Sequence, residues 1–328
     1  MQINYSVVIR TIGKAGDKYK ALLNSIEKLN PSPIEIIVVI PEGYSLPKER
    51  IGNGLKEKFI FSKKGMVEQR LRGIEEAKGE YLLICDDDIA FDSDFVCKLY
   101  EPIQKNICKM SAGPLLSFFP PKGIRGLYNN ISSGAVETIF NKDKYVHILK
   151  SSGWSYNRNI NLDKKVYYYT ESLPWTCFFA EKKALEDINL REEVVWLDKH
   201  GYASLDDQTM FYKAHLKGIE TVVVSDAIYE HLDARTSTKG VRDNVAYSKG
   251  FNRVVFWHRF IFMQQKNIVS KSISSIGFHY YMLCTKIYSF LKGIKSKQQR
   301  DQNKIFNSGI KEGRRYIKDL EYNSLEKI

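Results

Sequence analysis

The sequence lacks the features of a secreted protein. Its first residues, 1–9, contain no basic segment and lead directly into a strand-like run, so we expect no secretory signal. The five cysteines are odd in number and have no paired, metal-type spacing, which argues against a disulfide framework and against a zinc site. We therefore expect reduced thiols in a cytoplasmic protein.

Negative charge is scarce at the C-terminal end of the chain. From Arg235 onward there are 19 Lys and Arg against 6 Asp and Glu, whereas residues 1–234 have 31 against 32. The formal net charge of +12 thus belongs to the last part of the chain. With 328 residues, of which 43% are apolar, the chain exceeds one average domain and has material for a packed core. We expect one large domain with a basic appendage.

Strand-like and helix-like segments alternate over the first two-thirds of the sequence, with short connections. The predicted strands are 5–10, 34–40, 59–61, 81–85, 109–113, 174–180 and 221–224, and the predicted helices are 22–29, 66–77, 92–106 and 206–216. This alternation is typical of a doubly wound α/β sheet. Residues 114–170 are less regular, with many Gly, Asn and Ser, and we expect them to shape the surface.

Three carboxylates, Asp86-Asp87-Asp88, follow directly on the predicted strand 81–85. Ligands of such sheets bind at the carboxyl ends of the strands. Adjacent carboxylates repel one another unless a cation offsets their charge, and Mg²⁺ or Mn²⁺ with substrate phosphates is the common solution. The alternative is a solvated acidic turn that caps the helix predicted from Asp92.

The segment from Gly65 to Asp88 carries the sequence's most specific pattern. It contains a Gly65-x-x-x-Gln-Arg-Leu-x-Gly73 turn, then Ala77-x-Gly-Glu-Tyr, then the acidic strand end. This resembles the family 2 glycosyltransferases, inverting enzymes of the GT-A fold that build bacterial surface polysaccharides. The sequence departs from the family pattern at Gln69, where the family has Ala, and at Leu71, where it has Asn.

The resemblance implies a GT-A domain with a mostly parallel sheet over residues 1–233, divided into a nucleotide-sugar half, 1–113, and an acceptor half, 114–233. It implies that Asp86 and Asp88 form the Asp-x-Asp pair, with Asp86 facing the ribose and Asp88 on the metal that bridges the diphosphate. The residues expected to bind the donor are Thr11, Glu42, Arg70, Asp86 and Asp87.

The family resemblance continues at Asp206-Asp207, which opens a helix that ends at Gly218. In the family, the second carboxylate of such a pair deprotonates the acceptor hydroxyl, and this implies Asp207 as the base with Asp206 beside it. A general base contributes about 10²–10⁴ in rate. The alternative from the residues alone is that Asp206 caps this helix and that both carboxylates favour its N-terminus.

One histidine and two tryptophans complete the candidate site. The resemblance implies that His231, just after the strand 221–224, binds the metal, and neutral imidazole suits Mn²⁺. Trp175 and Trp196 are candidates for stacking on the acceptor sugar, with burial in the core as the alternative.

The basic tail, residues 234–328, has long helical patterns in which aromatic and apolar residues alternate with Lys and Arg. It is too polar to span a bilayer, because His279, Thr285 and Lys286 interrupt its apolar run. We expect amphipathic helices that bind an anionic membrane, or a lid packed on the catalytic domain, or both. A nucleic-acid partner is not expected, because no nucleic-acid motif accompanies the charge.

The sequence therefore predicts a metal-dependent, inverting glycosyltransferase at the inner face of the plasma membrane. Its expected partners are a nucleotide-diphosphate sugar and a glycan or lipid-linked acceptor, with Mn²⁺ or Mg²⁺ as cofactor. Two alternatives remain open at this point: a nucleotidyltransferase of related fold, and a non-catalytic module that binds a membrane or a nucleic acid.

Overall fold

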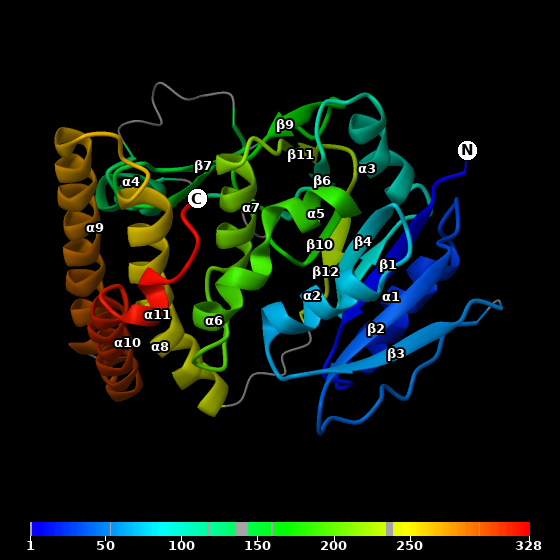
Figure 1. Ribbon diagram of the computed structural model, residues 1–328, viewed down its shortest axis with the longest axis horizontal. Helices are drawn as coiled ribbons and strands as arrows, with labels where there is room; N and C mark the ends of the chain where they lie inside the picture. The colour runs from blue at the N-terminus through cyan, green and yellow to red at the C-terminus, as the bar shows by residue number, and fades with distance from the viewer. Residues whose placement is uncertain are drawn as a thin grey trace.

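The computed structural model describes residues 2–52, 54–116, 119–121, 123–135, 144–158, 160–233, 239–294 and 296–328. An eight-stranded sheet forms the centre of the right half in Figure 1, with strand order β3-β2-β1-β4-β10-β6-β11-β9. Its strands are β1 Tyr5–Arg10, β2 Glu35–Pro41, β3 Glu57–Ser62, β4 Tyr81–Asp86, β6 Met110–Ala112, β9 Tyr167–Tyr169, β10 Cys177–Glu181 and β11 Thr221–Val224. Two small sheets pair β12 (Tyr229–His231) with β5 (Ile89–Phe91) and β7 (Val146–Ile148) with β8 (Ser155–Asn157).

Most strands of the large sheet run in one direction. Strands β3, β2, β1 and β4 are mutually parallel, and β11 is parallel to β6. Strand β10 is antiparallel to both β4 and β6, and β9 is antiparallel to β11 at the edge. This topology confirms the predicted mostly parallel α/β sheet of the GT-A type. The tyrosine run 167–169 lies within the segment predicted to be irregular, and it forms the edge strand β9.

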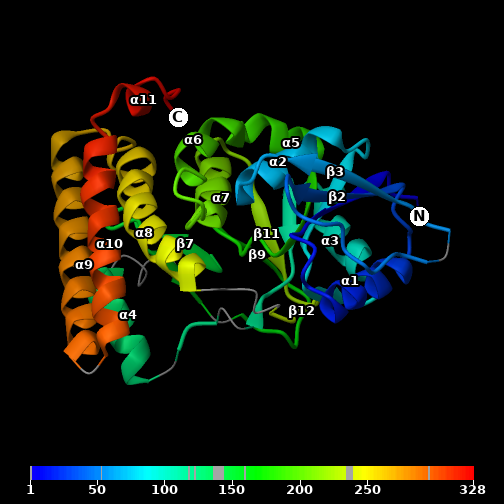
Figure 2. The ribbon, with the colours of Figure 1, turned by 90° about the horizontal axis from the view of Figure 1, so that it is seen from below.

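Helices cover both faces of the sheet and continue into the basic tail. They are α1 Asp17–Glu27, α2 Met66–Glu76, α3 Phe95–Gln104, α4 Ile124–Ser133, α5 Lys182–Ile188, α6 Val194–Leu197 after the 3₁₀ turn η3 Leu190–Glu193, α7 Asp206–Leu216, α8 Lys239–Phe256, the π-helical turn η4 Trp257–Phe262, α9 Ile268–Ile294, α10 Lys297–Tyr316 and α11 Leu320–Asn323. Figure 2 shows α8, α9 and α10 side by side, with α4 next to α9.

Alternate residues of each central strand contribute to two separate apolar cores. Val7 and Ile9 of β1 face the core that contains α1 and α3, whereas Val8 faces the core that contains α2 and α7. Burial on both faces explains the nearly continuous apolar runs of these strands.

The second of these cores extends into the basic tail. Phe251, Phe256 and Phe260 belong to the same buried cluster as Val8 and Phe211. The tail therefore packs on the rest of the chain as a helical layer, as Figure 1 shows at its left side. The predicted boundary at 233 falls beside residues 234–238, which lie outside the described residues.

A buried charge cluster joins this layer to the acceptor half. Glu193 is fully buried, and its carboxylate accepts hydrogen bonds from Arg259 Nε at 2.8 Å and from Lys213 Nζ at 2.6 Å. Arg259 belongs to η4 and Lys213 to α7. Because charges are buried only when paired, this cluster fixes how the tail meets the domain.

Two glycines of the family pattern act in packing. A Cβ atom on Gly73 would lie 2.3 Å from Val8 Cγ1, and one on Gly79 would lie 2.4 Å from the backbone nitrogen of Ser6. Both glycines thus let the segment around α2 approach β1 closely. This approach places Arg70 of α2 beside the end of β4.

Candidate active site

The acidic triplet lies where the sequence predicts it, at the carboxyl end of β4. Asp86 is the last residue of β4 and is paired in register with Arg10 of the neighbouring strand β1. Asp87 and Asp88 form the turn to β5. The triplet does not cap α3, because the short strand β5 intervenes and the residue before α3 is Asp94, whose side chain makes no capping bond.

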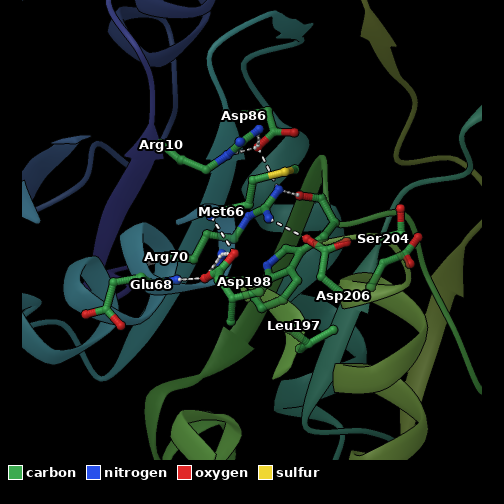
Figure 3. A network of polar contacts seen from close by, with 12 residues as sticks. Arg10, Met66, Glu68, Arg70, Asp86, Leu197, Asp198, Ser204 and Asp206 are labelled. Atoms are coloured by element: carbon green, nitrogen blue, oxygen red, sulfur yellow. Dashed lines mark hydrogen bonds and ion pairs between the residues drawn. The ribbon is translucent and has the colours of Figure 1, made fainter. Parts of the chain in front are cut away.

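Arg70 is the centre of the site's polar network (Figure 3). Its Nη2 donates to Asp86 Oδ1 at 2.9 Å and to the carbonyl oxygen of Trp175 at 3.1 Å, and its Nη1 donates to Asp206 Oδ2 at 2.8 Å. Arg10 donates to the same oxygen of Asp86, at 3.1 Å from Nε and 3.0 Å from Nη2. The side chain of Arg70 is only 3% exposed, so these ion pairs are shielded from water. One guanidinium thus connects the nucleotide-sugar half to the acceptor half.

Asp206 and Asp207 begin α7, as predicted. The residue before them, Leu205, has a left-handed backbone with φ of 67°, which a non-glycine residue rarely adopts. Leu205 has no side-chain oxygen with which to cap the helix, and Asp206 is held by Arg70. The pair is therefore placed by tertiary contacts, and Asp206 is not the helix cap that the alternative required.

The two carboxylates differ in their surroundings. Burial, together with the charge of the adjacent Asp206 carboxylate, raises the pKa of Asp207 to about 7. Burial also raises the pKa of Asp206, but the Arg70 and Arg10 guanidinium groups oppose this effect. An ion-paired carboxylate next to one with a pKa near neutrality is the division of roles expected of a positioning residue and a base.

Asp207 borders a pocket of about 260 Å³, which we call the acceptor-side pocket. This volume lies just below the usual range of ligand sites, about 300–1,000 Å³. The pocket is lined by Tyr145, Val146, Trp154, Ser155, Asn157, Ser172, Leu173, Pro174, Leu205, Asp207, Gln208 and Arg253. A small polar ligand bound there would contact the Asp207 carboxylate.

Asp88 and His231 come together across the small sheet. His231 pairs with Ile89 in the β12–β5 register, and its Nε2 lies 3.3 Å from Asp88 Oδ1. Through a hydrogen bond and its charge, Asp88 raises the pKa of His231. Mg²⁺ takes ligands at about 2.0–2.1 Å in octahedral geometry, so two adjacent ligand atoms lie about 3 Å apart. The separation of these two atoms fits that requirement.

No group of three or more His, Cys, Asp or Glu side chains within the described ranges is arranged to hold a metal ion. A nucleotide-bound divalent ion needs fewer protein ligands, because substrate phosphates complete its coordination. Asp88 and His231 therefore fit a metal that arrives with a diphosphate.

The remaining donor-binding candidates lie around the same edge of the sheet. Thr11 follows β1, and its hydroxyl donates to Asp87 Oδ2 at 2.5 Å. Burial raises the pKa of Asp87 to about 6 despite this bond. Glu42 follows β2 and is exposed to solvent. Gln69, where the family has Ala, donates from Nε2 to the carbonyl oxygens of Thr11 and Val39, both at 3.1 Å, and so ties the ends of β1 and β2 together.

The two tryptophans require a correction. Trp196 has no exposed surface, and its Nε1 donates to Glu193 Oε2 at 2.8 Å. It is a core residue and offers no ring face to a sugar, contrary to the sequence-based prediction. Trp175 is 3% exposed, and the Arg70 guanidinium lies 4.5 Å from the centre of its ring. Its contact is with Arg70, whose position it fixes.

Two residues of the network were missed by sequence reasoning. Arg10 was assigned only to a strand, although its guanidinium pairs with Asp86. Asp198 accepts hydrogen bonds from the backbone nitrogens of Met66 at 2.9 Å and Glu68 at 3.0 Å, and so caps α2 from 130 residues away along the chain. The one available signal was Gly65, which precedes α2 without a side chain able to cap it.

Comparison with known families agrees with this geometry. Residues 49–188 match the model described as glycosyl transferase family 2. This part of the chain is similar to glycosyl transferase family 2. The matched segment contains Arg70 and the acidic triplet, whereas Asp206, Asp207 and His231 follow it. A comparison with curated protein sequences found no match.

Three solved structures have a chain that follows a similar course. A crystal structure of GalNAc-T7 with UDP, GalNAc and Mn²⁺ is 15% identical, with a TM-score of 0.49, and the match covers 85% of this chain and 56% of that one. TarS 1–349 of S. aureus with UDP-GlcNAc is 13% identical, with a TM-score of 0.44 and coverage of 96% and 92%. The mannosyltransferase PcManGT of Pyrobaculum calidifontis with GDP-Man and Mn²⁺ is 11% identical, with a TM-score of 0.46 and coverage of 95% and 87%. This chain spans a little over half the length of the GalNAc-T7 chain.

Proposed function

We propose that this protein is an inverting glycosyltransferase. It moves a sugar from a nucleoside-diphosphate donor to a hydroxyl of a glycan or lipid-linked acceptor during the synthesis of a cell-surface polysaccharide. The observation that carries this proposal is the double ion pair of Arg70, with Asp86 at 2.9 Å and Asp206 at 2.8 Å. Through these two ion pairs, the buried cation Arg70 binds Asp86, the carboxylate expected to face the donor. The same cation binds Asp206, the residue next to the expected base.

The chain's own residues account for the steps of such a transfer. The carboxylate of Asp207 takes the proton as the acceptor O–H bond breaks, and the freed oxygen forms a bond to the anomeric carbon. At the same time the bond from that carbon to the diphosphate breaks, and its electron pair leaves with the nucleoside diphosphate. One base suffices for this single displacement, because no covalent sugar–enzyme intermediate forms.

A divalent metal would be held by Asp88 and His231, together with the diphosphate. When bound, Mn²⁺ or Mg²⁺ stabilises the negative charge that develops on the leaving group. Thr11 and Arg10 keep Asp87 and Asp86 in place beside it, since each donates a hydrogen bond to one of these carboxylates.

This function is tested by measuring nucleoside-diphosphate release from a panel of UDP-, GDP- and dTDP-sugars with Mn²⁺ or Mg²⁺. We expect turnover of at least one donor by the wild-type protein, and its loss in Asp207→Asn. Exposed Asp163 provides a matched control, because Asp163→Asn makes the same chemical change away from the site. Exchange of pyrophosphate into a nucleotide, without sugar release, would instead identify a nucleotidyltransferase.

We further propose that the tail binds the inner face of an anionic plasma membrane. The described residues contain no helix long and apolar enough to cross a bilayer. Helix α9 nevertheless exposes many large apolar side chains, and the adjacent α4 adds more. They are Ile268, Val269, Ile273, Ile276, Leu283, Ile287, Phe290, Leu291 and Ile294 on α9, and Ile124, Leu127 and Ile131 on α4. Such a surface is far larger than the scattered apolar residues of an ordinary protein surface.

The positive charge of the tail favours a membrane over a second copy of the chain. Residues from Arg235 onward have 19 Lys and Arg against 6 Asp and Glu, and each Lys near an anionic surface adds about 1 kcal/mol of attraction. The same excess of positive charge on two tails opposes their association.

Flotation with vesicles of phosphatidylglycerol and phosphatidylcholine tests the membrane proposal. We expect the protein to float with the vesicles, and Ile276→Asp with Phe290→Asp to abolish flotation. Leu320→Asp, at a residue that is 89% exposed on α11, is the matched control and should float. A wild-type protein that does not float with the vesicles and forms dimers would overturn the proposal.

A further inference from the structure

The acceptor-side pocket combines residues from both parts of the chain. Asp207 borders it from α7, Trp154, Ser155 and Asn157 border it from the segment around β8, and Arg253 borders it from α8 of the tail. Among the described residues that line this pocket, Asp207 has the one carboxyl group and Arg253 the one cationic side chain. The tail therefore supplies a cation to the pocket that holds the expected base.

Arg253 is held in place by aromatic rings. Its Nη1 donates to the hydroxyl of Tyr281 at 2.7 Å, and its guanidinium lies 5.5 Å from the ring centre of Trp154 and 5.1 Å from that of Tyr281. Within the part of the chain that the structure describes, Arg253 forms no ion pair with a carboxylate. Two aromatic faces thus fix the guanidinium while its charge stays unmatched.

A second cation lies close to Arg253. Lys249 is one turn earlier on α8, and the pKa of its ammonium group is lowered by burial and by the Arg253 charge. Two neighbouring like charges destabilise the free protein, and an anion bound beside them relieves this repulsion. Arg253 borders the pocket together with Asp207, and Lys249 adds a second positive charge near it. The excess of positive charge on this side of the pocket indicates a site that is complete only with an anionic ligand.

The acceptor-side pocket also continues away from Asp207. Trp154, Ser155 and Asn157 line both this pocket and an adjoining hollow of about 260 Å³, whose other wall includes Pro121 and Asn130. The two hollows share these three residues, and Asn130 of α4 borders the second. A ligand longer than one sugar unit, with its first unit beside Asp207, would extend toward the second hollow.

We propose that the acceptor carries an oxyanion, a carboxylate or a phosphate, next to the hydroxyl that receives the sugar, and that Arg253 binds this oxyanion. This inference rests on the proposed function and names the chemical class of the acceptor. The planar fork of arginine matches both kinds of oxyanion with two parallel hydrogen bonds. Arg253 thereby makes the tail a determinant of acceptor specificity.

Binding experiments with simple sugars test this inference without knowledge of the natural acceptor. Glucuronate, glucose 6-phosphate and glucose are titrated by saturation-transfer NMR into the full-length protein with a nucleoside diphosphate and Mn²⁺. We expect at least one of the two anionic sugars to bind at least tenfold more tightly than glucose. Which of them binds distinguishes a carboxylate acceptor from a phosphate acceptor.

Variants assign this preference to Arg253. Arg253→Gln should lose at least tenfold in affinity for the anionic sugar and leave the affinity for the nucleoside diphosphate unchanged. Lys249→Gln, which removes the second cation one turn from Arg253 on α8, should weaken binding of the anionic sugar severalfold. Arg315→Gln, which removes an exposed charge on α10, is the control and should change neither affinity.

Two results separate failure of this inference from failure of the proposed function. Equal binding of glucose and both anionic sugars by a protein that binds the nucleoside diphosphate would overturn the inference alone. Unchanged preference in both Arg253→Gln and Lys249→Gln would also overturn it. Absence of nucleoside-diphosphate binding in the wild-type protein would overturn the proposed function itself.

Discussion

The guanidinium of Arg70 lies 2.8 Å from the carboxylate of Asp206, although 136 residues separate them along the chain. This buried ion pair connects α2 of the nucleotide-sugar half with α7 of the acceptor half. The same guanidinium binds Asp86, so the two carboxylates are positioned relative to each other by one side chain.

Replacement of the expected base should abolish transfer and spare donor binding. Asp207→Asn removes the proton acceptor, so we expect turnover to fall by about 10²–10⁴. The dissociation constant for the nucleotide sugar, measured by calorimetry with Mn²⁺, should change less than threefold. Turnover within threefold of wild type in Asp207→Asn would assign the base elsewhere.

The pKa of the base predicts the pH dependence of transfer. Asp207, whose pKa is raised to about 7 by burial and by Asp206, accepts a proton only when it is ionised. Activity should therefore rise with pH between about 5 and 8, with its midpoint near 7. A profile of kcat/KM that is flat across this range would contradict the assignment.

Removal of Arg70 should affect both stability and the pH profile. Arg70→Ala leaves Asp206 without its ion-pair partner and Asp86 with Arg10 alone, and breaking a buried pair costs about 3–5 kcal/mol in free energy of unfolding. Because the Arg70 charge lowers the pKa of Asp206 and of Asp207, its loss should move the rise of activity to higher pH. Urea denaturation measures the loss in free energy of unfolding.

The pH profile of activity is also measured for Arg70→Lys, a variant that keeps the positive charge. It should shift less than that of Arg70→Ala, although a lysine cannot bind two carboxylates with the arginine fork. Identical profiles in wild type and in both variants would show that Arg70 has a structural role only.

The buried cluster around Glu193 should hold the tail on the domain. Glu193→Gln removes the carboxylate that hydrogen-bonds to the buried cations Lys213 and Arg259. Only the Glu192 carboxylate then remains, at 3.8 Å from each of them, and we expect a loss of about 3 kcal/mol in unfolding free energy. Glu312→Gln breaks an exposed pair on α10 and should cost at most about 1 kcal/mol. Equal stability of the two variants in urea would show that the tail is not fixed through Glu193.

Local patterns allowed the regular elements to be predicted from the sequence. The nearly continuous β-branched run of residues 34–40 predicts a strand covered on both faces, and the apolar run of 81–85 predicts a further strand. Strands β2 and β4 confirm both predictions. The helix that begins at Asp206 and ends before Gly218 was predicted from its acidic start and its glycine stop. These signals lie within a few residues of one another along the chain.

The contacts that the sequence did not predict connect distant segments. Arg10 and Arg70 could each have faced solvent, and only the packing of α2 on β1 directs both to Asp86. Likewise, Trp196 has the same local signals as a surface aromatic, and its burial follows from Glu193, Arg259 and the helical tail. That Arg253 and Asp207 border the same pocket depends on how α8 packs, which no local pattern encodes.

The most direct test of the account is the binding of nucleoside diphosphates to the wild-type protein and to Asp88→Ala, measured by calorimetry with and without Mn²⁺. We predict that the wild-type protein binds UDP, GDP or dTDP much more tightly when Mn²⁺ is present. Asp88→Ala should lose this metal-dependent gain and remain folded, because Asp88 contributes to the site and not to either core. Binding that is independent of Mn²⁺, or unchanged in Asp88→Ala, would contradict the proposed metal and donor site.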